Sequence, residues 1–280
     1  MAIPRKKILK NLESLREQGI PIIGGGAGTG ISAKFEEAGG IDLIIIYNSG
    51  RYRMAGHVSL TGLFAYGDAN SVMLEMANEV LPVVKNTPVL AGVNGTDPFR
   101  QMTYFLKHIK ETGFSGVQNF PTVGLFDGKM RANMEACGLG YDKEVDMIGI
   151  ANRLDLLTTP YCFNRDEAKE MVNAGADIIV AHVGLTTGGS IGATDSMTLE
   201  QAVEATIDIT ETARSLRKDI FVLCHGGPFD EPENVAAALR KMPGIDGFYG
   251  ASSIERLPVE RAITEQVKKF KKINLNQEYN

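Results

Sequence analysis

Short apolar, β-branched runs recur along the chain and alternate with segments of helical period. Within each run the hydrophobic residues are nearly continuous, which is typical of parallel strands buried on both faces. We count eight such runs and expect eight strands. They are Pro21–Ile23, Ile41–Tyr47, Pro88–Val93, Gly116–Asn119, Leu154–Thr158, Ala176–His182, Ile220–Cys224 and Gly244–Tyr249.

The segments between these runs carry apolar residues at helical spacing. Examples are Ala69–Val84, Phe99–Thr112, Arg165–Asn173, Leu199–Leu216 and Pro232–Lys241. Eight strands that alternate with helices predict an α/β protein, a (β/α)8 TIM barrel. A further helix, Arg5–Gln18, precedes the first strand and is expected to cover the bottom of the barrel.

We therefore expect one TIM-barrel domain over residues 1–280. Residues 1–19 form its N-terminal helix, 20–257 its strands and helices, and 258–280 a C-terminal helix and tail. Glycine stops several helices just before Asp42, Asp177 and Asp246, which open the next strands. Acidic residues at the N-terminal ends of barrel strands are expected to serve stability rather than catalysis.

Composition narrows the function classes. The net charge is −5 and the basic residues are scattered, so neither nucleic acid nor an anionic membrane is an expected partner. Three well-separated cysteines without a CxxC pair argue against a disulfide framework or a zinc site. No apolar signal core follows the N-terminus. We expect a cytoplasmic protein.

Catalytic residues of barrel enzymes lie just after the strands. His182 and His225 end the sixth and seventh runs, and they are two of only four histidines. Histidine exchanges protons near neutral pH, so this pair is the expected acid–base machinery. Glu255 and Asp97, which follow other strands, are expected to assist. Asp97 has the alternative of capping a helix, and Glu255 that of pairing with Arg256 at the rim.

Several residues after the strands are suited to bind a small anion through backbone N–H, hydroxyl, amide or guanidinium groups. They are Gly24, Gly25, Ser49, Gly50, Arg51, Asn94, Asn119, Ser252 and Arg256. The glycines have the alternative of simple turning, and Arg51 that of a solvated side chain. A long stretch, Phe120–Ile150, follows the fourth strand and is interpreted either as a lid or as an oligomer contact.

The run from Gly28 to Gly50 resembles the opening of the phosphoenolpyruvate mutase and isocitrate lyase barrels. The whole chain resembles the predicted TIM-barrel proteins called phosphoenolpyruvate hydrolase-like. The strings Ala-Gly-Val-Asn-Gly-Thr-Asp, Gly-Val-Gln-Asn-Phe-Pro-Thr-Val-Gly, Ala-His-Val-Gly and Gly-Ala-Ser-Ser-Ile-Glu-Arg carry this resemblance. It implies a homo-oligomer that packs or exchanges its last helix, here Pro258–Ile273.

The resemblance to the wider superfamily also implies site roles. Ser49 and Gly50 match a Ser-Gly pair that binds the substrate's acidic group, and His182 matches a histidine that touches the substrate. Asp68 matches an acid that helps to bind Mg²⁺ through water. The superfamily's strand-4 acid is replaced by Asn119.

The superfamily's paired aspartates after the third strand are replaced around Gly92 and Asn94, and its strand-5 arginine falls near Thr159. We therefore expect no Mg²⁺ held tightly by several protein carboxylates. The alternative left open is an ion bound through water and substrate, with Asp68 in its outer shell. The first hypothesis is a lyase or hydrolase of a small anionic oxo-acid or phosphorylated acid. The alternative is a non-catalytic barrel that senses a similar metabolite.

Overall fold

Nine strands in the described residues are hydrogen-bonded in one parallel sheet, ordered β5-β4-β3-β2-β1-β9-β8-β7-β6. The computed structural model describes residues 2–194 and 196–275. The strands are β1 (Ile22–Gly26), β2 (Leu43–Ile46), β3 (Val89–Gly92), β4 (Gly116–Gln118), β5 (Leu157–Thr158), β6 (Tyr161–Cys162), β7 (Ile178–His182), β8 (Phe221–His225) and β9 (Gly247–Gly250).

The two ends of this strand order are joined by the chain itself. Only Thr159 and Pro160 separate β5, which pairs with β4, from β6, which pairs with β7. Backbone bonds continue across the break, because Thr159 N donates to Val117 O and Val180 N donates to Pro160 O. The two short strands are thus one barrel strand, and the sheet closes into the predicted (β/α)8 barrel.

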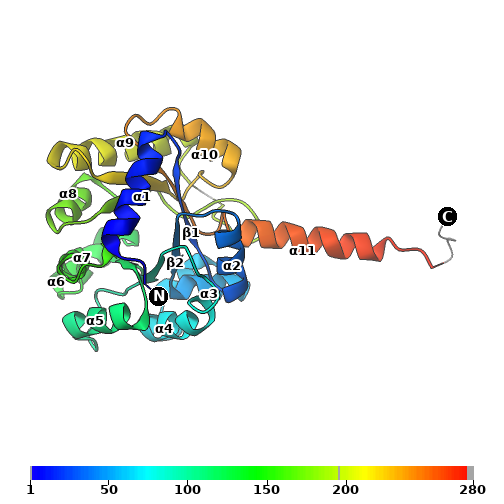
Figure 1. Ribbon diagram of the computed structural model, residues 1–280, viewed down its shortest axis with the longest axis horizontal. Helices are drawn as coiled ribbons and strands as arrows, with labels where there is room; N and C mark the ends of the chain where they lie inside the picture. The colour runs from blue at the N-terminus through cyan, green and yellow to red at the C-terminus, as the bar shows by residue number, and fades with distance from the viewer. Residues whose placement is uncertain (1, 195, 276–280) are drawn as a thin grey trace.

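The described helices mostly surround this barrel, whereas the first covers one end of it and the last extends away (Figure 1). They are α1 (Arg5–Glu17), α2 (Gly30–Ala38), α3 (Asn48–Met54), α4 (Ala69–Val80), α5 (Met102–Thr112), α6 (Gly128–Ala136), α7 (Tyr141–Arg153), α8 (Arg165–Asn173), α9 (Leu199–Leu216), α10 (Pro232–Leu239) and α11 (Arg256–Lys271), with 3-10 turns η1 (Ser59–Leu63) and η2 (Val123–Leu125). The stretch Phe120–Ile150, which the sequence suggests is either a lid or an oligomer contact, therefore contains η2, α6 and most of α7.

Helix α1 closes the N-terminal end of the barrel, as the sequence predicts. Ile8 and Leu12 are buried with the inward-facing strand residues. Arg5 pairs with Asp177 at 2.7 Å, and Arg16 pairs with Asp246 at 2.9 Å. These ion pairs hold the helix against the N-terminal ends of the strands. The two aspartates therefore stabilise the fold.

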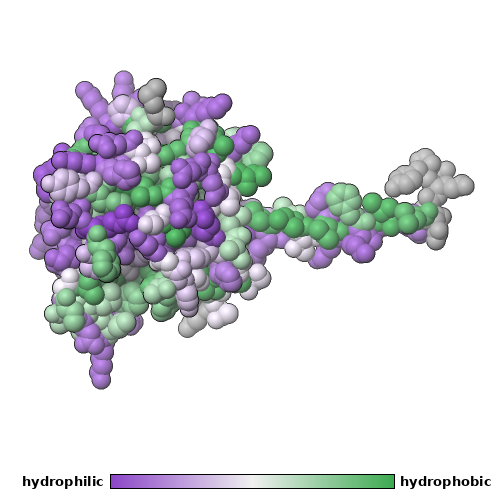
Figure 2. Space-filling model, turned by 90° about the horizontal axis from the view of Figure 1, so that it is seen from below, coloured by the Kyte–Doolittle hydropathy of each residue, from purple (hydrophilic) through white to green (hydrophobic). Residues whose placement is uncertain are grey.

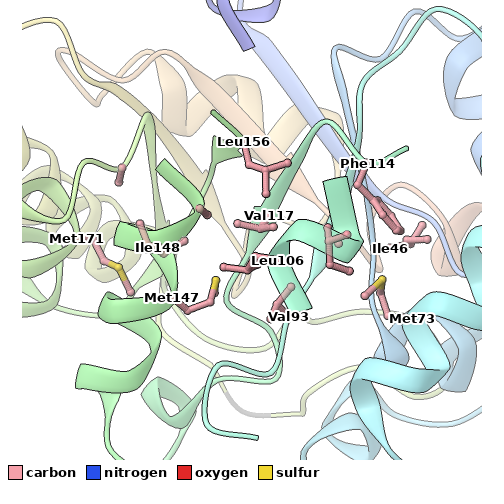
Figure 3. Close-up of a cluster of buried hydrophobic side chains, with 14 of the residues drawn as sticks. Ile46, Met73, Val93, Leu106, Phe114, Val117, Met147, Ile148, Leu156 and Met171 are labelled. Atoms are coloured by element: carbon pink, nitrogen blue, oxygen red, sulfur yellow. The ribbon is translucent and has the colours of Figure 1, made fainter. Parts of the chain in front are cut away.

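The main core lies between the sheet and its outer helices. Outward-facing Ile46 of β2 and Val117 of β4 pack with buried side chains of the surrounding helices, among them Leu106 of α5 and Met147 of α7 (Figure 3).

The described helices include none with the length and apolar character needed to cross a bilayer.

The last helix, α11, does not lie along the barrel. It extends away from the body for most of its length (Figure 1), and of its residues only Arg256 and Leu257 are buried. Ile263, Val267 and Phe270 are 61%, 54% and 62% exposed. They form part of an apolar stripe visible along the helix (Figure 2). The end of the expected tail, 276–280, lies outside the described residues.

Candidate active site

The two strand-end histidines meet at the carboxyl end of the barrel. His182 and His225 are register partners on β7 and β8, and their ring centroids lie 4.6 Å apart. Tyr161 packs against both rings at 4.9 and 4.8 Å, and Phe163 packs against His182 at 4.6 Å. The parallel register therefore brings together the two histidines that the sequence singles out.

Backbone hydrogen bonds give the two imidazoles opposite tautomers. Nδ1 of His225 lies 2.6 Å from the carbonyl oxygen of Tyr249, so this nitrogen must donate. Nδ1 of His182 accepts from Gly184 N at 3.1 Å. A neutral His182 therefore carries its proton on Nε2, whereas a neutral His225 has a lone pair there. The pair can offer one donor and one acceptor to a ligand.

Both imidazoles are held in the neutral form. The pKa of His225 is lowered to about 4, chiefly because the side chain is buried. The hydrogen bond to the Tyr249 backbone raises this pKa, whereas the positive charge of Arg53 lowers it. Burial and the neighbouring His225 lower the pKa of His182 well below its ordinary value. At neutral pH both imidazoles are therefore uncharged, so that His225 presents a lone pair and His182 a neutral hydrogen-bond donor.

A small cavity adjoins the histidines. Its volume of about 30 Å³ leaves room for about one water molecule. Both histidines are almost buried, at 5% and 6% exposure. The other lining residues come from the loops after several strands: Ser59, Leu60, Phe120, Leu125, Tyr161, Gly184, Leu185, Thr186, Ala251 and Ser252. Entry of a larger ligand requires these loops to move, so the site is closed rather than open at the rim.

A buried ion pair lies behind the cavity. Arg53 Nη2 is 3.1 Å from Glu255 Oε2, and both side chains are at most 1% exposed. Glu255 also accepts from Gly28 N at 2.5 Å, and Arg53 donates to Gly26 O at 3.1 Å. Glu255 thus joins α3, the loop after β1 and the segment after β9. Glu255 does not line the histidine cavity, although a residue that assists catalysis would be expected to do so.

The first correction concerns the glycines after the first predicted strand. Gly24 and Gly25 lie inside β1, paired with Leu43 and Ile44, and not in an anion-binding loop. A Cβ on Gly24 would lie 2.8 Å from the ring of Tyr249. The glycine is required there by the packing of an aromatic ring inside the barrel.

The second correction concerns the residues after β2, which form the helix α3. Arg51 points to α4 and pairs with Glu79 at 2.9 Å, partly exposed. Ser49 is buried, and its hydroxyl donates to Ser59 O at 2.6 Å. Gly50 packs against the loop after β1, where a Cβ would lie 3.0 Å from Ala27 O. None of the three lines the histidine cavity.

The loop after β3 is held mainly by Asn70 of α4. Asn70 bonds to the backbone of Asn94 and, at 2.8 Å, to Asp97. Asp97 also accepts from Phe99 N at 2.9 Å, and α5 begins only at Met102. Asp97 therefore neither caps that helix nor reaches the histidines.

After β9, Ser252 lines the cavity, and its role in substrate binding stays a prediction. Arg256 does not pair with Glu255. It pairs with Glu260 at 2.9 Å and donates to Gly188 O at 3.1 Å, so it holds the loop after β7.

Buried Cys224 precedes His225, and burial raises the pKa of its thiol to about 12, which leaves it inert at neutral pH.

Sequence reasoning missed Glu144, a fully buried carboxylate of α7. It accepts from the side chain of Asn119 at 2.6 Å, from the Thr122 hydroxyl at 2.7 Å and from Val123 N at 2.7 Å. Burial raises its pKa to about 8, although these hydrogen bonds act in the opposite direction. Asn119 thus contacts a carboxylate rather than the cavity.

The donor set does not fit a Mg²⁺ ion held directly by several carboxylates. Within 2–194 and 196–275, no three histidine, cysteine or acidic side chains are grouped to hold a metal. Asp68 caps α4 and pairs with Arg100 at 2.8 Å. Like Glu144 and Asp97, it is already engaged by protein donors.

The fold and the imidazole pair define a TIM-barrel protein with a closed site at the carboxyl ends of its strands. The chain belongs to the phosphoenolpyruvate hydrolase-like family, whose sequence profile matches residues 7–273. It is 59% identical over 271 residues to the tomato (Solanum lycopersicum) ToMV resistance protein Tm-1(GCR237). That match covers 97% of this chain and 36% of the tomato protein, so the chain spans about a third of this relative.

Two solved structures share the fold at low sequence identity. Oxaloacetate acetylhydrolase matches with a TM-score of 0.61 and 14% identity, over 99% of this chain and 91% of that one. A phosphonopyruvate hydrolase in complex with oxalate and Mg²⁺ matches with a TM-score of 0.58 and 13% identity, over 96% and 88%. At this identity the likeness shows the fold alone.

Proposed function

We propose that this barrel domain is an enzyme that acts on a small anionic oxo-acid or phosphorylated acid by lyase or hydrolase chemistry. The observation that carries the proposal is the pair of neutral imidazoles with opposite tautomers beside one cavity. The similar folds of oxaloacetate acetylhydrolase and phosphonopyruvate hydrolase support the substrate class. We expect the protein to work in the cytoplasm, without nucleic acid or membrane partners.

In this proposal Nε2 of His225 accepts the proton that leaves the reacting group. Nε2–H of His182 donates a hydrogen bond to the oxygen on which negative charge develops. Ser59, Thr186 and Ser252 line the same cavity and carry hydroxyl groups that can bind the acidic group. The aromatic walls formed by Phe120 and Tyr161 exclude water.

A turnover assay with oxaloacetate, phosphonopyruvate and phosphoenolpyruvate tests the enzyme against the alternative sensor. We expect turnover of at least one compound, and we expect EDTA to leave part of it intact, because the described part of the chain holds no group of carboxylates for a tightly held ion. A Mg²⁺ ion bound through substrate and water would add to this rate. Activity that vanishes with EDTA and returns fully with Mg²⁺ would contradict the expectation. Saturable binding without turnover would favour the sensor.

We also propose that the protein is a homo-oligomer in which α11 packs on a second copy. Beside the base of α11 lies a groove of about 680 Å³, lined mainly by apolar side chains, among them Ile31 and Phe35 of α2. Ile31 and Phe35 are 68% and 65% exposed. A helix whose apolar stripe is equally exposed fits such a groove, and mutual burial removes both surfaces from water.

Light scattering tests this assembly. We expect a mass of at least twice the 30.3 kDa of one chain. Lysine at both Ile263 and Val267 should return it to the monomer, because two charges would then face the apolar groove. The matched control, lysine at the exposed polar positions Thr264 and Gln266, should leave the mass unchanged. A wild-type mass near one chain at micromolar concentration would remove the proposal.

A further inference from the structure

Two aromatic side chains, Tyr161 and Phe120, form walls of the histidine cavity. Tyr161 contacts both imidazoles, and Phe120 lies with its ring centroid 6.3 Å from that of Tyr161. Neither wall residue makes a side-chain hydrogen bond to a histidine in the part of the chain that the structure describes. Both rings also lie near Tyr47, which packs against Phe120 at 4.6 Å and interacts with the side chain of Tyr161, and their positions depend in addition on how their backbones are held.

Asn119 holds the backbone of Tyr161 on both sides. Its Oδ1 accepts from Tyr161 N at 2.7 Å, and its Nδ2 donates to Tyr161 O at 3.2 Å. The same Nδ2 donates to Glu144 Oε2 at 2.6 Å. Because the amide plane of Asn119 is shared by these three bonds, the Glu144 carboxylate helps to fix its orientation.

Glu144 also holds the segment that carries Phe120. Its two oxygens accept from the hydroxyl of Thr122 and the backbone N–H of Val123, both at 2.7 Å. Asn119 and these two donors flank Phe120 and its following proline. A single side chain of α7, 24 to 25 positions away from Asn119 and Phe120 in the sequence, thus contacts the supports of both walls. On Tyr161 it acts beside the sheet pairing with β7 and the hydroxyl of Tyr141, which donates to Tyr161 O at 2.5 Å.

We propose that Glu144 is a positioning residue of the histidine site, which acts through Asn119 on Tyr161 and through Thr122 and Val123 on Phe120. It touches no ligand itself. The role extends the proposed function, because a site that depends on two packed aromatic walls loses its geometry when their common anchor is removed. A misplacement of about 1 Å costs on the order of 100-fold in binding or rate.

The test uses the full chain with ¹⁵N-labelled histidine, in which nuclear magnetic resonance reports the tautomer and environment of each imidazole. Glu144→Ala removes all three accepting contacts. Glu144→Gln keeps an oxygen for Asn119 and Thr122 but places an NH₂ group against Val123 N–H. We expect the signals of His182 and His225 to shift in both variants, more in Glu144→Ala, and those of His57 and His108 to stay. Oxalate affinity should fall in the same order.

Two controls separate positioning from loss of stability. Asp146→Asn removes an exposed carboxylate from the same helix. Val80→Ala removes buried core packing on α4, away from the cavity. Both should leave the His182 and His225 signals unchanged, even where the melting temperature falls. If Glu144→Ala does not fold, Glu144→Gln carries the test.

Unchanged His182 and His225 signals in Glu144→Gln would overturn the proposal, as would an equal shift in Val80→Ala at the same loss of stability. The readout does not depend on turnover. If wild-type protein neither binds oxalate nor turns over a substrate, the proposed function fails while the imidazole signals still decide the role of Glu144.

Discussion

Replacing His182 by alanine is expected to lower turnover by roughly 10²–10⁴-fold, the usual contribution of one acid–base group. The imidazole supplies the Nε2–H donor of the cavity, and neither Tyr161 nor Phe163 beside it can replace that donor at the same place. The measurement is steady-state turnover of the compound found active among oxaloacetate, phosphonopyruvate and phosphoenolpyruvate. Circular dichroism checks that the variant is folded.

The matched control is His108→Ala, which removes an exposed imidazole from α5 and should leave the rate unchanged. The pH profile adds a second check. Because the pKa of His225 is lowered to about 4, turnover that needs its neutral form should persist as the pH falls through 6.5 and be lost near 4. A rate that falls with an ordinary imidazole pKa, or equal rates in both alanine variants, would contradict the assignment.

The same pKa difference makes folding stability depend on pH. An unfolded histidine binds a proton below about 6.5, whereas folded His225 does so only near 4. The unfolded chain therefore binds more protons in this interval, and the neutral histidine's contribution to stability, fully present above 6.5, is lost as the pH falls towards 4.

Replacing Glu255 by alanine is expected to destabilise the fold by about 3–5 kcal/mol, the cost of leaving a buried charge without its partner. Arg53 is almost wholly buried and has Glu255 as its partner at 3.1 Å. Among the described residues its Nε has no hydrogen-bond partner. Without Glu255, Arg53 would keep the carbonyl oxygen of Gly26 at 3.1 Å and the electrostatic influence of buried Glu36, but would lose its ion-pair partner. Urea unfolding measures the change in the free energy of unfolding.

Glu79→Ala is the matched control, since it breaks the pair that α3 makes through Arg51 on the surface at 2.9 Å. Exposed pairs contribute about 0–1 kcal/mol. The two variants thus compare neighbouring arginines of one helix, one buried and one exposed. Equal unfolding free energies for the two would show that the buried pair has no special role.

The contrast between Arg51 and Arg53 also shows which parts of the site can be predicted from the sequence and which cannot. Parallel register follows from the buried hydrophobic runs, so the meeting of His182 and His225 could be predicted. The residues after β2 read as a loop, although they form α3. Two positions apart on a helix, Arg51 and Arg53 face roughly opposite sides, and only the phase of α3 decides which one is buried.

Long-range contacts explain the other omissions. Glu144 reaches Asn119 from a helix 25 positions further along the chain, and nothing in the spacing indicates that contact. The glycines of β1 have low strand propensity, so the hydrophobic pattern predicts a strand that ends at Ile23, three residues short of Gly26. Tyr249 makes Gly24 necessary there, and β9, which carries this ring, is more than 200 residues away.

The central claim is that His182 and His225 together bind a small anionic acid, and an oxalate titration followed by histidine ¹⁵N resonances tests it most directly. Oxalate is bound by a phosphonopyruvate hydrolase of similar fold. We predict saturable shifts of the His182 and His225 signals, with those of His57 and His108 unchanged. Signals of His182 and His225 that stay fixed up to saturating oxalate, oxaloacetate and phosphonopyruvate would contradict the account.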